Sequence, residues 1–203
     1  MKKVLLIVVV LGLVSTVAAQ TSNTSASGTG ECKLTLAQAP AIRGIRLGMS
    51  VDQVLAQIPG SEADSDLLAR LSRDYFGYLS TFVAPGNYVT SKEKFAGVSS
   101  IDLGFLDGRL SSFSIHYDGP EWKSNEQFVV RLAEVLNLPG VGSWKPSNNF
   151  GLAIACDGFE ISVQTPGPKD ARIAMKDMKV DISKVVHERE EVPKEKARRA
   201  FKP

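Results

Sequence analysis

Two Asp-Gly dipeptides, each between stretches of alternating apolar and polar residues, constrain the fold of this chain more than any other feature. Asp-Gly favours the tight turns of β-hairpins, because both positions tolerate positive φ angles. A two-residue turn at Asp157-Gly158 places the large apolar side chains on one face. It does so by pairing Cys156 with Phe159, Ile154 with Ile161 and Leu152 with Val163. The sequence therefore predicts antiparallel strands.

The other dipeptide, Asp107-Gly108, predicts a different loop. A two-residue turn there would place Ile101 opposite Ser114 and would leave Phe113 on the polar face. We therefore predict a three-residue loop, Leu106-Asp107-Gly108, in which the glycine takes the left-handed position of a G1 bulge. This register puts six apolar residues on one face: Ile101, Leu103, Phe105, Phe113, Ile115 and Tyr117.

Capping-box patterns predict two helices. Ser50 and Gln53 begin the first, which ends at Pro59-Gly60. Ser124 begins the second, which runs to Leu138 with four apolar residues on one side: Phe128, Leu132, Val135 and Leu136. The pattern also predicts a shorter helix at 66–73 and strands at 172–178 and 32–36.

The order helix, hairpin, helix, hairpin, strand predicts an α+β fold, with helices packed on an antiparallel sheet. We expect a single domain over residues 32–184. Two related helix-plus-hairpin halves, 32–120 and 121–184, are one interpretation of this order. The halves share no convincing residue-level repeat, so duplication stays open.

The N-terminus has the pattern of a cleavable secretory signal peptide. Lys2 and Lys3 precede an apolar run from Val4 to Val14, and small residues follow up to Ala19, where we expect cleavage. A spanning helix needs about 18 apolar residues, so an uncleaved anchor is disfavoured. Residues 1–19 therefore predict an exported protein, periplasmic or extracellular, with no membrane span in the mature chain.

Both flanks of the predicted domain are polar. Residues 20–31 are expected to be a flexible leader, and residues 185–203 a charged flexible tail around Pro193. Without Lys2 and Lys3, the 24 basic residues fall to 22, equal to the 22 acidic ones. This balance gives no electrostatic argument for nucleic acid binding.

The sequence contains two cysteines, Cys32 and Cys156. An exported protein folds in an oxidising compartment, where a cysteine pair favours a disulfide. The second hairpin directs Cys156 toward the core, where Cys32 could meet it. Two free thiols or a reactive nucleophile are the alternatives.

Motifs for catalysis or for a cofactor are few. The two histidines, His116 on the face opposite the predicted core and His187 in the charged tail, are too few for a metal site, so no metal and no cofactor is expected. Ser91 and Lys94 match the S-x-x-K pattern of penicillin-recognising enzymes, but the K-T-G companion is absent. We predict no catalytic residue.

One segment, residues 75–88, is dense in aromatic side chains and is broken by Gly77, Pro85 and Gly86. Its rings could complete the core, or those that are exposed could form a partner surface together with two tryptophans. The candidate partner surface comprises Tyr75, Phe76, Tyr78, Phe82, Tyr88, Trp122 and Trp144.

The segment Arg46-Leu47-Gly48-Met49-Ser50, followed by Val54, resembles the helix start of small exported bacterial modules. These are the BamE (small protein A/OmlA) outer-membrane assembly lipoproteins and the related β-lactamase-inhibitor-protein-like fold. The chain departs from the BamE lipoproteins by its greater length and by the lack of their anchoring cysteine. The resemblance implies a non-enzymatic module that contacts a protein in the cell envelope.

These features together predict an exported, non-catalytic module that binds an unknown envelope or secreted protein. Two alternatives stay open. One is a hydrolase whose site is assembled from residues far apart in the sequence. The other is an inhibitor of a secreted enzyme that presents a loop such as Ala84 to Thr90.

Overall fold

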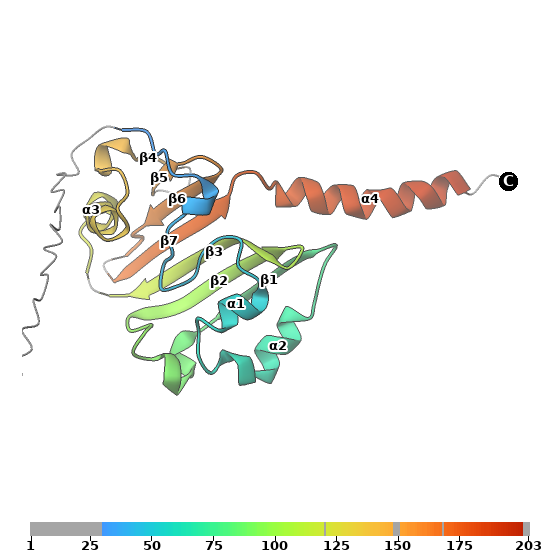
Figure 1. Ribbon diagram of the computed structural model, residues 1–203, viewed down its shortest axis with the longest axis horizontal. Helices are drawn as coiled ribbons and strands as arrows, with labels where there is room; N and C mark the ends of the chain where they lie inside the picture. The colour runs from blue at the N-terminus through green and yellow to red at the C-terminus, as the bar shows by residue number, and fades with distance from the viewer. Residues whose placement is uncertain (1–29, 120, 148–150, 168, 201–203) are drawn as a thin grey trace, which may run out of the picture.

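The computed structural model describes residues 30–119, 121–147, 151–167 and 169–200, so the predicted signal peptide and most of the leader lie outside it. The described residues form one antiparallel sheet in the order β1-β2-β3-β7-β6-β5-β4 (Figure 1). Its strands are β1 (Tyr78–Val83), β2 (Val98–Leu106), β3 (Arg109–Asp118), β4 (Lys145–Pro146), β5 (Leu152–Ala155), β6 (Phe159–Gln164) and β7 (Asp170–Asp177). The α-helices are α1 (Val51–Leu55), α2 (Ser65–Leu71), α3 (Asn125–Leu136) and α4 (Ile182–Ala200).

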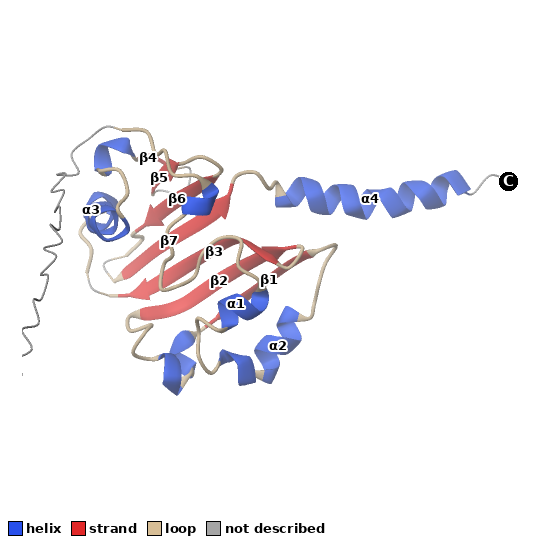
Figure 2. Ribbon diagram, viewed as in Figure 1, coloured by secondary structure: helices blue, strands red, loops and turns tan. Residues whose placement is uncertain are grey.

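The predicted fold class, an α+β arrangement with helices packed on the sheet and two helix-plus-hairpin halves as one interpretation, is wrong. β3 pairs with β7 from Ser112–Lys176 to Asp118–Asp170, which joins both hairpins into one sheet. β1 and β4 extend this sheet at its two edges, whereas α1 and α2 have only 5 and 7 residues (Figure 2). The described chain is therefore mainly a single open sheet.

The hairpin at Asp157-Gly158 has the predicted register. Ile154 lies opposite Ile161, and the Cys156 N–H donates to the Phe159 carbonyl at 2.8 Å. The predicted Cys32–Cys156 disulfide is also present, with the two Cα atoms 4.7 Å apart. The first described segment is therefore covalently attached to this hairpin.

The strand predicted at 32–36 is wrong. Thr35 forms only an isolated parallel bridge with Asp157, and a short 3-10 helix follows at Leu36–Gln38. One backbone hydrogen bond, from the Asp157 N–H to the Leu34 carbonyl, supplements the bridge. The disulfide therefore holds this segment where strand pairing does not.

The hairpin at Asp107-Gly108 has a two-residue turn, so the predicted three-residue loop is wrong. Leu106 lies opposite Arg109, and the two turn residues have φ values of 50° and 72°. A bulge at Ser111 then shifts the register between Gly104 and the next residue of β2. This shift places Leu103 opposite Phe113 and Ile101 opposite Ile115, so these apolar residues share one face as predicted, although the register differs. The extra residue therefore lies inside β3 and not in the turn.

One face of the sheet forms the core. Of the six residues predicted for the inner face of the first hairpin, five are at most 3% exposed and Tyr117 is half-buried. Ile173 and Met175 of β7 continue this face, as predicted. The capping box at Ser50 is confirmed, because its hydroxyl accepts the Gln53 N–H and the Gln53 side chain accepts the Ser50 N–H.

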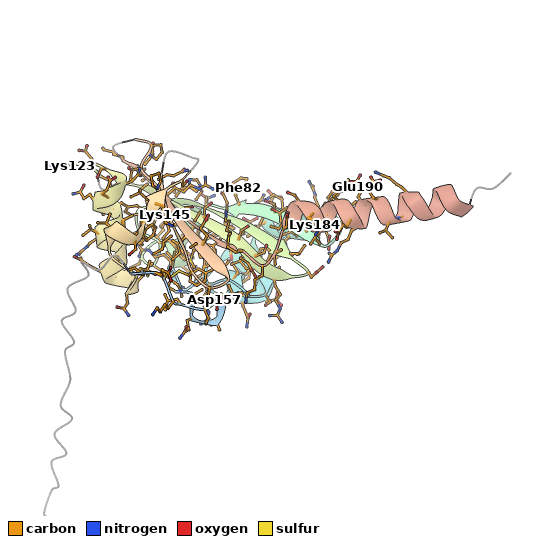
Figure 3. The ribbon with its side chains drawn as sticks, turned by 90° about the horizontal axis from the view of Figure 1, so that it is seen from above. Phe82, Lys123, Lys145, Asp157, Lys184 and Glu190 are labelled. Carbon is orange, nitrogen blue, oxygen red and sulfur yellow. A yellow bond between two sulfur atoms is a disulfide. The ribbon has the colours of Figure 1, made fainter. Side chains whose placement is uncertain are left out.

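Helix α4 occupies the residues for which we expected a flexible tail. It runs away from the sheet, with Lys184 and Glu190 on the side opposite Lys123 and Lys145 (Figure 3). The Arg189 guanidinium attaches it to the body through two bonds to the Asp107 carboxylate, at 2.7 and 2.8 Å, and one to the Phe76 carbonyl at 2.9 Å. Ion pairs four residues apart, such as Lys194 with Glu190, support a helix that is mostly polar.

Replacing both cysteines, in the variant C32S/C156S, is expected to lower the free energy of unfolding by about 4–5 kcal/mol, because the bridge closes a long loop in the unfolded chain. Guanidinium chloride unfolding, followed by circular dichroism, measures this change. A reductant should destabilise the wild type and leave the variant unaffected. Equal stability of the two proteins under oxidising conditions would contradict the prediction.

Arg189→Met is expected to speed hydrogen exchange in residues 182–194, because α4 loses its attachment to the turn. The Lys184→Met variant, on the same helix, should leave exchange unchanged.

Hydrogen bonding to Arg189 lowers the pKa of Asp107 below its usual value, so the contact persists above that usual value and is lost as pH falls through the lowered pKa. Hydrogen exchange measured by mass spectrometry tests both the effect of Arg189→Met and the effect of pH. Equal exchange rates in the two variants would contradict the first prediction. Protection of α4 in the wild type that does not fall with pH would contradict the second.

Candidate functional site

The face of the sheet opposite the core carries a shallow polar depression of about 310 Å³. All of its lining residues belong to β1, β2, β3, β6 and β7. Its polar lining residues include Tyr78, Asp102, Ser114, Glu160, Arg172 and Lys176. We call this surface the polar face.

Strand alternation and the β3–β7 register bring these residues together. Asp102 lies opposite Ser114 across β2 and β3, and His116 lies opposite Arg172 across β3 and β7. Each occupies a position between two core residues, because successive side chains point to opposite faces of a sheet. Residues from three separate segments therefore meet on the polar face.

A chain of hydrogen bonds crosses the three strands. The Ser114 hydroxyl donates to Asp102 Oδ2 at 3.0 Å, and His116 Nε2 lies 2.8 Å from the same oxygen. Arg172 Nη2 donates to the Ser114 oxygen at 3.1 Å. Ser114 thus links the Asp102 carboxylate to the Arg172 guanidinium, although these two groups do not bond to each other directly.

The guanidinium of Arg172 has more N–H donors than hydrogen-bond partners. Its guanidinium carries five N–H groups, of which one bonds to Ser114. Its Nε is buried and has no hydrogen-bond partner, and no described carboxylate pairs with it. The neighbouring Lys176 and Glu160 satisfy each other at 2.8 Å. Arg172 is therefore the group on this face with unused capacity to bind an anion.

The arrangement suits binding better than hydrolysis. A catalytic triad places the histidine between the serine and the carboxylate, whereas here Asp102 lies between Ser114 and His116. Ser114 is also buried, and its proton is directed at the carboxylate. Its oxygen is not oriented to attack a substrate.

The S-x-x-K motif is not assembled as a site either. The buried Ser91 hydroxyl donates to the Pro59 carbonyl at 2.7 Å. Lys94 Nζ donates to the Gln57 carbonyl at 2.7 Å and to the Gln57 side-chain oxygen. Both side chains fasten the loop that follows α1. The motif therefore has a structural role.

The candidate partner surface is divided among several places. Tyr75, Phe76 and Phe82 are 53%, 38% and 56% exposed, and Trp144 is buried with its indole N–H donated to the Pro139 carbonyl. Tyr78, Tyr88 and Trp122 are half-buried. Tyr78 and Phe82 share the side of β1 that faces the depression, whereas Tyr75 and Phe76 contact each other in the loop before β1 and Trp122 contacts Phe128.

Asp102, Ser114 and Arg172 were not predicted from the sequence as site residues. The available signal was their alternation with core residues, which had already placed His116 on the outer face. The described residues contain no group of three or more His, Cys, Asp or Glu side chains placed to hold a metal ion. In the same part of the chain, no helix has both the length and the hydrophobicity needed to cross a bilayer. His187 is exposed on α4.

Asp64→Asn is expected to lower the pKa of Tyr88 part of the way toward its usual value. Burial and the hydrogen bond that Tyr88 donates to Asp64, at 2.7 Å, together raise the pKa of Tyr88 to about 12. Asparagine still caps α2 but carries no charge. Titration of labelled tyrosine rings by NMR, assigned with Tyr88→Phe, measures the shift. An unchanged pKa would mean that Asp64 does not hold the ring.

No family model, no curated protein and no solved structure matches this chain. The geometry of the polar face is therefore the structural basis for assigning a function.

Proposed function

We propose that this chain is an exported, non-catalytic module that binds a protein of the cell envelope or of the secreted fraction through its polar face. The observation that carries the proposal is the depression on this face, which contains Arg172 with no carboxylate partner among the described residues. Export is supported by the pattern of residues 1–19 and by the Cys32–Cys156 disulfide, which favours an oxidising compartment.

The shape of the polar face favours a protein over a small molecule. Small-molecule sites are concave and mostly apolar, and they enclose most of the ligand. This depression, about 310 Å³, is at the small end of such sites, and it is lined mainly by hydroxyl and charged groups from five strands, with Leu103, Phe113, Ala174 and Met175 beside them. Protein interfaces combine such polar groups with tyrosine and arginine, the residues that most often carry binding energy. Tyr78 and Arg172 supply both here.

The partner is expected to insert an acidic side chain into the depression. A carboxylate can accept two parallel bonds from a guanidinium, and such pairs are stronger than neutral hydrogen bonds. Glu160 is already paired with Lys176, and Asp102 with His116, so neither competes directly for Arg172. The half-exposed ring of Tyr78 and the exposed ring of Phe82 supply apolar contact at the β1 side.

The loop considered for the inhibitor hypothesis is held at several points. Tyr88 bonds to Asp64, the Thr90 hydroxyl donates to the Pro59 carbonyl at 2.6 Å, and Pro85 is buried. Between Pro85 and Thr90, Val89 is the apolar side chain with the largest exposed fraction, 81%. The polar face offers more groups of complementary chemistry than this single side chain does, so it is the better candidate surface. The resemblance at Gly48-Met49-Ser50 supports the same class of function.

Site-specific photo-crosslinking in cells that export the full chain tests the proposal. A photoreactive residue replaces Ser80 or Ser162, which line the depression, and the matched controls replace the exposed Lys33 or Lys92. We expect one common protein adduct from the two face positions and none from the controls.

A competition step then tests the role of Arg172. Added wild-type protein should displace the adduct, whereas added Arg172→Met protein should require roughly tenfold more, because a charge-assisted bond contributes about 1.5–3 kcal/mol. Adducts at the control positions alone, or equal competition by both proteins, would contradict the proposal.

A further inference from the structure

A second cavity, separate from the polar face, lies beside α3. It has a volume of about 570 Å³ and shares no lining residue with the depression. The apolar part of its wall includes Ile42, Trp122, Leu132 and Val135, and its cationic residues are Arg43 and Arg131. We call it the α3 groove.

The α3 groove leaves an apolar helix side without a cover. The sequence pattern predicts that Phe128, Leu132, Val135 and Leu136 face the core, but only Phe128 is buried. Leu132 and Leu136 are half-buried, and Val135 is 70% exposed. The described residues thus bury the first part of the predicted apolar side and leave the rest lining an open groove. Such an exposed patch is typical of a binding site.

The polar part of the groove is cationic. Arg43 donates to the carbonyls of Lys94 and Ala96, at 3.0 and 3.3 Å, and has no described carboxylate partner. Tyr117 lies beside it: burial raises the pKa of the Tyr117 hydroxyl, while the charge of Arg43 and a hydrogen bond to it act in the opposite direction. The groove lining contains no acidic residue. An anion is therefore the complementary headgroup.

We propose that the α3 groove binds a medium-chain fatty acid. The carboxylate accepts hydrogen bonds from Arg43 and from the Tyr117 hydroxyl. The alkyl chain lies along Trp122, Leu132 and Val135 and replaces the cover that α3 lacks. This site does not depend on the function proposed for the polar face.

The volume of the groove decides between an alkyl chain and a helical peptide. A helix is about 10–12 Å across, so 570 Å³ holds only about one turn of it. A methylene group fills on the order of 30 Å³, close to the share of one water molecule in the liquid. A chain of about 12 carbons therefore fits within the groove.

Intrinsic fluorescence provides the test, because Trp122 lines the groove and the other tryptophan, Trp144, is buried. The full chain is titrated with dodecanoate below its micellar concentration, and calorimetry gives the affinity independently. We expect saturable binding that changes the emission. Octanoate should bind at least tenfold more weakly, because it buries four fewer methylene groups. The Trp122→Phe variant should lose most of the emission change.

Matched variants on α3 locate the ligand. Val135→Asp places a carboxylate in the groove and should weaken dodecanoate binding at least tenfold. Val130→Asp makes the same substitution at an exposed position of α3 outside the groove and should change it less than twofold. Arg43→Met should weaken dodecanoate but not dodecanol, which lacks the carboxylate.

Four outcomes would overturn the proposal: no saturable dodecanoate binding, equal weakening by Val130→Asp and Val135→Asp, dodecanol binding as tight as dodecanoate, or tighter binding of a single-chain phospholipid. If an acidic helical peptide bound more tightly than dodecanoate, and Val135→Asp weakened that binding, the groove would likewise be assigned to a protein partner.

Discussion

The pairing of β3 with β7 is the interaction on which the rest of this structure depends. It joins two hairpins that lie far apart in the sequence, so that Ile115 and Ile173 continue one core and His116 and Arg172 continue one polar face. Side chains alternate along each strand, so a slip of one residue would move Arg172 into the core and Ile173 into solvent. One register therefore fixes both the stability of the fold and the composition of the candidate site.

Local chemistry made part of this fold predictable. The Asp157-Gly158 turn, the inward Cys156 and the Ser50 cap depend on neighbouring residues, and each is confirmed. The sequence predicts the extra residue of the first hairpin in the turn, whereas the structure has it at Ser111. Periodicity does not distinguish the two positions, because an extra residue anywhere along a strand restores the same alternation. The β3–β7 pairing could not be inferred from periodicity, since its partners are separated by a helix and a second hairpin. Alternation alone places Asp102 and Ser114 on the outer face, but their proximity to Arg172 depends on this pairing.

The two faces of one sheet lead to two different kinds of surface. On the polar face, Arg172 Nε has no acceptor among described groups that otherwise satisfy each other. On the other side, Val135 is 70% exposed in a groove that also contains Arg43, which has no carboxylate partner among the described residues. These two deficits differ in chemistry, because one is an unused donor and the other is exposed hydrocarbon. A protein contact at the first and an alkyl chain at the second could therefore occupy the molecule together.

The edges of the sheet explain why a partner would approach its face. An exposed edge strand offers unpaired backbone groups, and proteins commonly block it with charges or proline. At β1, Arg70 donates to the Phe82 carbonyl at 3.4 Å and lies over the Phe82 ring, 5.2 Å from its centroid. At the other edge, β4 is two residues long and contains Pro146, which has no N–H to donate. Strand addition is thus disfavoured at both edges, whereas the polar face keeps its donors available.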